Sequence, residues 1–150
     1  MNRREFITLL GGAGAWPLAA RAQQAAMPVI GFLHTRSREG FMPNLAGFAK
    51  ALNQAGYGEG RNIAIEYRYA DGVEERLPKL AAELVQLSVD VIFVTGTTAT
   101  QAVKNATKTI PIVMTSVTDP IGTGIVTSLA HPDGNVTGLA NLSELGGLRY

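Results

Sequence analysis

The sequence predicts an α/β fold with a doubly wound parallel sheet, in which strands and helices alternate along the chain. Four short runs of apolar, β-branched and aromatic residues begin near residues 29, 63, 91 and 111. The segments between these runs carry apolar residues at helical spacing. The strand starts lie about 20 to 34 residues apart, which leaves room for one crossover helix each and therefore predicts parallel pairing.

The first half of the chain supplies two strands and one helix. The first predicted strand is the apolar run at 29–33. The helix after it has one apolar face, formed by Phe41, Leu45, Phe48, Ala49 and Leu52. Gly56 and Gly58 follow that face and are typical of the glycines that end helices. Polar and apolar residues alternate over 63–69, which predicts a half-exposed strand near a sheet edge.

A second helix is predicted over residues 77–87, where leucines and alanine recur on one face. Pro78 is compatible with that helix because it falls in the first turn. The run at 91–94 is uniformly apolar, which predicts a strand buried on both faces.

The remaining elements are shorter. The sequence predicts a helix over 98–106, a strand over 110–114, a shorter helix over 120–129 and one more strand over 136–140. Residues 143–150 begin a further helix-like pattern.

Residues 1–22 have the features of a bacterial export signal. Arg3 and Arg4 precede an apolar, glycine- and alanine-rich run at 9–20, and Ala20-Arg21-Ala22 supplies a cleavage site. The run is too short for a membrane span, which needs roughly 20 apolar residues. The paired arginines followed by x-Phe-Ile resemble a twin-arginine signal, although the general secretion route remains open. An ordinary amphipathic first helix is the alternative.

Charge and cysteine content exclude several classes of protein. The chain has 13 Lys and Arg against 12 Asp and Glu. Residues 1–22 hold three arginines and one glutamate, so the body has ten basic and eleven acidic residues. Such a body has no basic stripe, which argues against nucleic-acid binding. Without cysteine there is no disulfide, thiol nucleophile or lipid anchor after Ala22. We expect a soluble periplasmic protein that matures near Gln23.

Small polar residues follow three of the predicted strands, where parallel sheets bind their ligands. They are Thr35 and Ser37 after the first strand, Gly96, Thr97 and Thr98 after the third, and Ser116, Thr118 and Asp119 after the fourth. A helix that begins near Thr98 would offer free N–H groups to a carboxylate or phosphate. We therefore expect a small polar solute at this rim.

Each of these residues also has a purely structural interpretation. Thr98 and Asp119 are typical helix N-caps, although Asp119 is equally suited to pair with a ligand ammonium. His34 fits a buried residue at the end of a strand better than a ligand. Arg36 and Arg38 are either solvated or attract anions to the cleft.

Catalytic and cofactor motifs are absent from the sequence. No phosphate-binding glycine loop follows a strand, and no nucleophile elbow or His-Glu-x-x-His is present. The two histidines are far apart and lack clustered acids. We therefore expect neither enzymatic activity nor a bound cofactor or metal.

A set of motifs gives the chain a family resemblance over about residues 27–147. They are Leu52-x-x-x-Gly56-Tyr57-x-x-Gly60-Arg61-Asn62-Ile63-x-Ile65-Glu66-Tyr67-Arg68, Leu77-Pro78-x-Leu80-Ala81-x-Glu83-Leu84-Val85, Thr118-Asp119-Pro120 and Pro132-x-Gly134-Asn135-Val136-Thr137-Gly138. With them the chain resembles the ABC-transporter substrate-binding proteins of the tryptophan/tyrosine-type branch.

The resemblance implies a type I periplasmic-binding-protein fold, with two α/β lobes, a small solute and an ABC permease as partner. Carried over by position, it implies that Thr97 and Thr98 hold a carboxylate and that Asp119 meets an ammonium. The expected organisation is an export signal over 1–22 for the export machinery, a solute-binding lobe over 23–138 and, over 139–150, the start of a crossover toward a missing second lobe. A short C-terminal cap is the alternative to that crossover.

Two other functions remain open from the sequence alone. One is an exported α/β enzyme of racemase or oxidoreductase type that uses the same cleft. The other is a ligand-sensing lobe of a regulator, although such proteins carry a DNA-binding or membrane segment that this sequence lacks.

Overall fold

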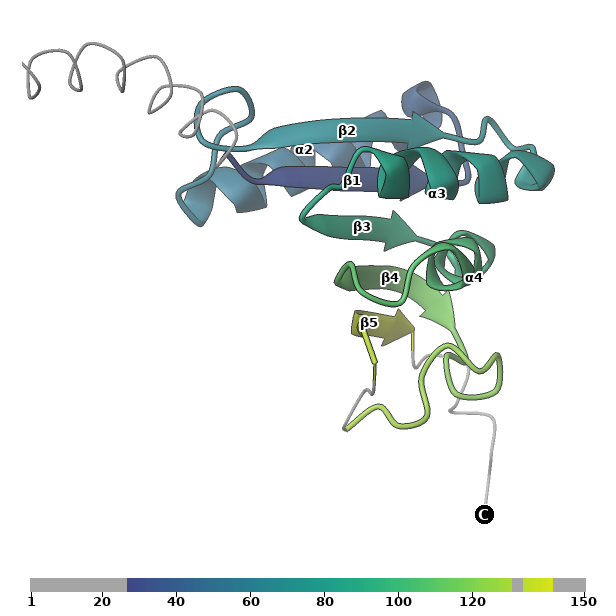
Figure 1. Ribbon diagram of the computed structural model, residues 1–150. Helices are drawn as coiled ribbons and strands as arrows, with labels where there is room; N and C mark the ends of the chain where they lie inside the picture. Colours follow the sequence, from purple (N-terminus) through teal and green to yellow (C-terminus); the bar gives the residue numbers. More distant parts are fainter. Residues whose placement is uncertain (1–26, 131–133, 142–150) are drawn as a thin grey trace, which may run out of the picture.

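The computed structural model describes residues 27–130 and 134–141 and contains one parallel sheet flanked by helices (Figure 1). The five strands are β1 (Val29–His34), β2 (Ala64–Tyr69), β3 (Val91–Thr95), β4 (Ile112–Thr118) and β5 (Val136–Asn141). All neighbouring strands pair in parallel, in the order β2-β1-β3-β4-β5. The predicted α/β fold class is confirmed.

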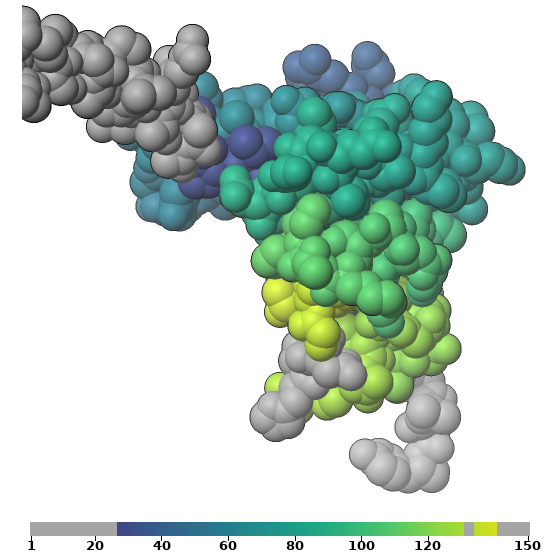
Figure 2. All heavy atoms as spheres, viewed as in Figure 1, coloured from purple at the N-terminus to yellow at the C-terminus, as the bar shows by residue number. Residues whose placement is uncertain are grey.

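Helices lie on both faces of this sheet. They are α2 (Arg38–Gln54), α3 (Leu77–Gln86) and α4 (Thr97–Ala106), with a short 3₁₀ turn η1 (Glu74–Arg76) before α3. In Figure 1, α3 and α4 lie in front of the sheet and α2 lies behind β1 and β2. The space-filling view shows that α3, α4 and the chain after β4 form a continuous surface on the front (Figure 2).

The predicted export signal at 1–22 lies outside the described residues. β5 carries 139–141, the first residues of the predicted crossover segment, and the rest of that segment also lies outside them. Among the helices of the described residues, none combines the length and apolar character needed to cross a bilayer.

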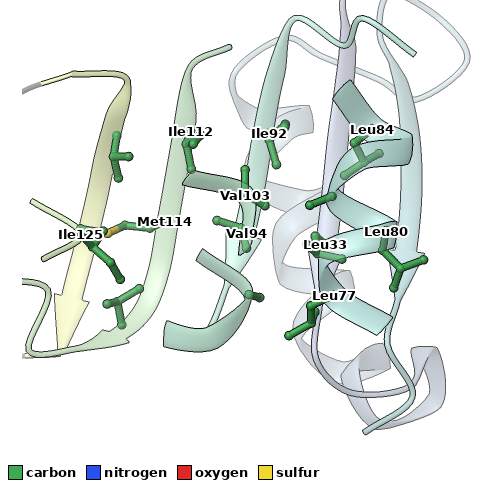
Figure 3. Close-up of a cluster of buried hydrophobic side chains, with 14 of the residues drawn as sticks. Leu33, Leu77, Leu80, Leu84, Ile92, Val94, Val103, Ile112, Met114 and Ile125 are labelled. Atoms are coloured by element: carbon green, nitrogen blue, oxygen red, sulfur yellow. The ribbon is translucent and has the colours of Figure 1, made fainter. Parts of the chain in front are cut away.

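The face covered by α3 and α4 holds an aliphatic core (Figure 3). Leu33, Ile92 and Ile112 project from β1, β3 and β4 and are fully buried. Leu84 of α3 and Val103 of α4 close over them. Burial of such a side chain contributes about 1.5–3 kcal/mol, so this layer stabilises the fold.

The opposite face, covered by α2, is aromatic. Phe32 is fully buried and its ring lies 5.3 Å from Phe41 and 5.6 Å from Phe48, both on α2. Tyr67 and Phe93 of the neighbouring strands approach the same ring, at 5.5 and 5.6 Å. Phe48 of α2 contacts Phe93 of β3 with 4.8 Å between ring centroids, yet Val91 and Phe93 keep partial exposure. The prediction that this strand is buried on both faces is therefore wrong.

Helix α2 begins and ends with local hydrogen bonds that the sequence encodes. Ser37 caps its first turn by accepting a bond from the Gly40 N–H (3.2 Å). At the other end Gly56 adopts a φ of 91°, and the N–H of Tyr57 donates a hydrogen bond to the carbonyl of Leu52 (2.8 Å). This is a Schellman motif, and it confirms Gly56 as the helix-ending glycine.

Two predicted elements near the end of the chain are corrected by the structure. β4 spans Ile112–Thr118 and not 110–114, so Ser116 and Thr118 lie within the strand and not beyond it. Residues 120–129 form turns and not a helix. Asp119 and Gly124 both have positive φ, 44° and 73°, which breaks helical geometry on each side of residues 120–123.

The extension of β4 depends on an irregular pairing with β5. The register shifts between Met114 and Val117, and Ser116 takes a φ of 54° at this bulge. Gly138 lies opposite Met114 with a φ of 138°, and a Cβ there would overlap the backbone of Met114. Gly138 therefore allows the close approach that forms the bulge.

We expect Gly138→Ala to destabilise the fold by about 3 kcal/mol, since it combines backbone strain with a steric clash against main chain. Urea unfolding followed by circular dichroism measures this. Gly47→Ala is the matched control, because a Cβ at Gly47 meets open space in the middle of α2 and should stabilise by up to about 1 kcal/mol. Equal effects at the two glycines would contradict the proposed role of Gly138.

Candidate functional site

A cavity of about 250 Å³ opens at the carboxyl ends of β1, β3 and β4, and we call it the rim cavity. It lies where the strand order reverses, because β1 sits between β2 and β3. Parallel α/β sheets bind ligands at such a switch point, since the crossovers leave on opposite faces there. The rim cavity is lined by His34, Thr35, Arg36, Gly40, Phe41, Asn44, Thr95, Gly96 and Ser116.

The end of β1 forms one wall of the rim cavity. His34 is only 5% exposed, and its ring lies 4.2 Å from that of Phe41. Its Nδ1 accepts a hydrogen bond from the Arg36 N–H (2.9 Å), so the ring is neutral with its proton on Nε2. Burial, and secondarily the Arg36 charge, lowers the pKa of His34 below its usual 6.5.

The ends of β3 and β4 form the second wall. The hydroxyls of Thr95 and Thr115 are hydrogen-bonded across the two strands at 3.2 Å. The bulge in β4 turns the next residue, Ser116, to the cavity. Gly96 has a φ of 100° and lies close to Thr35, so it lets the chain turn from β3 directly into α4.

The first turns of α2 form the third wall. Gly40, Phe41 and Asn44 lie there, within the first two helical turns after the Ser37 cap. They contribute an aromatic ring and a side-chain amide beside the hydroxyls of the strand ends.

The electrostatic character of the rim cavity is positive. Arg36 is its one ionised lining residue, since His34 is neutral at pH 7. Arg36 forms no ion pair within the described part of the chain. Its guanidinium is therefore available for a carboxylate. No group of three or more potential metal ligands comes together among the described residues.

Three of the eight predicted ligand-binding residues line the rim cavity, namely Thr35, Gly96 and Ser116. Their role in ligand binding stays a prediction. The other five, Ser37, Thr97, Thr98, Thr118 and Asp119, do not line it.

Those five residues have structural partners instead. Ser37 caps α2, and the Thr97 hydroxyl accepts a bond from the Thr118 N–H (3.1 Å). Thr98 donates to Glu74 (3.3 Å) and is not the N-cap of α4, a position that Gly96 occupies. The carboxylate of Asp119 accepts from the Gly122 N–H (2.9 Å), which caps a turn and not a helix.

The α2 residues Gly40, Phe41 and Asn44 line the rim cavity but are not among the residues that the sequence predicts at the rim. Phe41 was assigned to a core face of the helix, and it does pack there against Phe32. The available signal was the short distance from the end of the first strand to the helix, which brings the first helical turns to the rim.

The buried, neutral His34 makes stability depend on pH. Its folded pKa lies below the unfolded value of 6.5, so the unfolded state binds more protons in the window below pH 6.5. Stability from this group is present above pH 6.5 and is lost as pH falls toward the folded pKa. We expect the free energy of unfolding to fall between pH 7.5 and 5.5, by no more than about 1.4 kcal/mol per pH unit for one proton.

Urea titrations across this range check the effect, with His34→Gln as the comparison. The free energy of unfolding of the variant should depend less on pH in this window. Any contribution from His131 is the same in both proteins. An unchanged slope in His34→Gln would contradict the assignment.

Comparison with known proteins identifies the family. Residues 29–146 match the family model described as ABC transporter substrate binding protein. The chain is 43% identical over 95 residues to a tyrosine-binding protein from Clostridioides difficile (strain R20291), a match that covers 63% of this chain and 28% of that protein.

Solved structures agree with the fold. A ligand-free, open substrate-binding protein with adhesive properties from Clostridium difficile has a TM-score of 0.71 and 32% identity, over 79% of this chain and 43% of its own. A conserved domain protein from Vibrio cholerae O1 biovar El Tor has a TM-score of 0.72 and 34% identity, over 77% and 39%. An ABC domain in complex with L-Trp from Streptococcus pneumoniae has a TM-score of 0.70 and 30% identity, over 77% and 39%.

The chain thus spans less than half the length of each of these relatives. The family model matches residues 29–146. That range contains the five-stranded sheet and the rim cavity at the switch point. The chain belongs to the ABC transporter substrate-binding protein family.

Proposed function

We propose that this chain forms part of the solute-capturing component of an ABC importer, and that its solute is an amino acid with an aromatic side chain. The observation that carries the proposal is the rim cavity, where Arg36, three hydroxyl groups and the Phe41 ring meet at the switch point of the sheet. The printed ligands of two relatives, tyrosine and L-Trp, support the choice of solute.

The chemistry of the rim cavity suggests how such a solute would bind. A carboxylate placed near Arg36 and Ser116 would gain charge-assisted hydrogen bonds, and Gly96 brings the N-terminus of α4 to the same place. An aromatic ring would pack against Phe41, which is itself fixed by His34 and Phe32.

The solute ammonium needs a partner from another part of the protein. Asp119 remains our predicted partner from the family resemblance, although its carboxylate now accepts a backbone bond and does not line the rim cavity. Rearrangement of the turn at 119–122 would be required to free it.

The mechanism that we propose is closure around the solute. About 250 Å³ is small for a ligand site, since such pockets enclose about 300–1,000 Å³. The relatives are more than twice as long as the matched part, so the remaining contacts would come from a second lobe. Closure of two lobes on the solute would stabilise the state that the permease recognises. Residues 1–22 would direct export to the periplasm.

An exported enzyme remains the alternative function. No phosphate loop, nucleophile elbow or acid–base pair supports it, and the family to which the chain belongs consists of transporter components. Turnover of a solute by the purified protein would favour this alternative.

The solute is tested by thermal shift and calorimetry on a version extended through the region that the relatives carry beyond the match. We expect L-tyrosine or L-tryptophan to raise the melting temperature, because a ligand at 100 times its Kd adds about 2.7 kcal/mol to stability. Tyramine and tryptamine, which lack the carboxylate, should have little effect. No shift with any aromatic amino acid would overturn the choice of solute.

Two variants test the rim cavity itself. Arg36→Gln should weaken amino-acid binding about tenfold or more, and Thr95→Val, which removes one hydroxyl at nearly constant shape, should weaken it severalfold. Lys108→Gln is the matched charge control, because Lys108 lies at the opposite end of the sheet. Equal affinities for Arg36→Gln and Lys108→Gln would place the solute elsewhere.

Export is tested by replacing Arg3 and Arg4 together with lysine. We expect this chain to accumulate in the cytoplasm if the twin-arginine route carries it, because that pathway requires the arginine pair. Cell fractionation and immunoblotting measure the distribution, with Arg21→Lys as the control outside the pair. Continued export of the double variant would assign the chain to the general route.

A further inference from the structure

A second cavity, separate from the rim cavity, lies between α2 and the edge strand β2. It measures about 530 Å³, and we call it the α2–β2 groove. Its helical wall consists of Met42, Leu45, Ala46 and Ala49, which share one side of α2. This side differs from the one on which Phe41 and Phe48 pack against the sheet. Helix α2 therefore has two apolar sides, of which only one is covered by the core.

The floor of the groove is aromatic and carries one unpaired polar atom. The rings of Tyr67 and Tyr69 are parallel, with centroids 6.2 Å apart. The Tyr67 hydroxyl donates to Glu59 (3.0 Å). The Tyr69 hydroxyl is shielded from solvent and has no hydrogen-bond partner among the described residues. Such a group is costly unless something pairs with it.

Arg38 stands at one end of the groove and is also without a partner. It is the first residue of α2, where the helix dipole disfavours a cation. No carboxylate lies within ion-pair distance of it in the described residues. Its exposed guanidinium is therefore free to meet an anion in the groove.

Glu59 stands at the other end, beyond the C-terminus of α2. From Arg38 to Ala49 the helix rises about 16 Å, so the groove is long as well as apolar. It presents a positive charge at one end, an apolar middle and a negative charge at the other end.

We propose that the α2–β2 groove is a second ligand site that binds a monocarboxylate with an extended apolar tail. The carboxylate would lie at Arg38, within reach of the Tyr69 hydroxyl after a small side-chain movement, and the tail would lie along Leu45, Ala46 and Ala49. Glu59 would repel a second carboxylate at the far end, which selects monocarboxylates over dicarboxylates.

Both tyrosines suit this role because they are neutral. Burial raises the pKa of Tyr67, with a further contribution from its hydrogen bond to Glu59. Burial also raises the pKa of Tyr69, against an opposing effect of Arg38. The phenols therefore keep their protons as donors and do not repel an anion at neutral pH.

This site is independent of the proposed amino-acid site, since the two cavities share no lining residue. A ligand in the groove would contact the outer side of α2, and one in the rim cavity would contact its first turns. The two proposed sites can therefore be tested separately.

The test uses octanoate as the probe, with titration calorimetry and saturation-transfer NMR on the 150-residue chain. We expect saturable binding of octanoate, with weaker binding of octanol, which lacks the charge, and of suberate, which carries a second carboxylate. Arg38→Gln should weaken octanoate binding about tenfold or more. Ala46→Phe should abolish it by filling the groove, and circular dichroism verifies that this surface variant folds.

Lys50→Gln is the matched control, because Lys50 is an exposed cation of the same helix that does not line the groove. It should bind octanoate as the unaltered chain does. Three results would each overturn the proposal: no saturable binding of octanoate, equal binding of octanoate and suberate, or equal losses in Arg38→Gln and Lys50→Gln.

Discussion

The position of β1 between two parallel neighbours is the constraint on which the rest of the structure depends. Because β1 pairs with both β2 and β3, the chain must leave it over one face to reach β2 and return over the other face to reach β3. The helices that follow β1 and β3, α2 and α4, therefore lie on opposite faces of the sheet. The rim cavity is the space between these two helices at the strand ends, and its residues come from the ends of β1, β3 and β4 and from the first turns of α2.

The two faces of the sheet are built with different side chains, and this difference shapes the two cavities. Aliphatic side chains interdigitate under α3 and α4, which leaves that layer closed. The ring of Phe32 meets those of Phe41, Phe48 and Tyr67 at angles between 42° and 57°, and these contacts hold α2 against the sheet. Both the rim cavity and the α2–β2 groove border α2.

Much of the fold was predictable because the strands at 29–34, 64–69 and 91–95 and the helices after them have clear periodicity. The predictions of the fold were wrong where residues close together in the sequence do not determine the structure. The bulge that carries β4 through Ser116 requires Gly138 of another strand, and no pattern within 110–118 encodes that contact. At the site, the position of Thr97 and Thr98 before a helix does not reveal that their hydroxyls form hydrogen bonds with Thr118 and Glu74, residues distant in the sequence.

Tyrosines such as Tyr67 and Tyr69 determine the fluorescence of the body of the chain. The only tryptophan of the chain is Trp16, inside residues 1–22, so a chain that begins at Gln23 has none. Its ultraviolet emission would come from tyrosine alone, and the emission of an indole solute would stand apart from it. Excited at shorter wavelengths, the tyrosines would transfer energy to a bound indole but not to one free in solution.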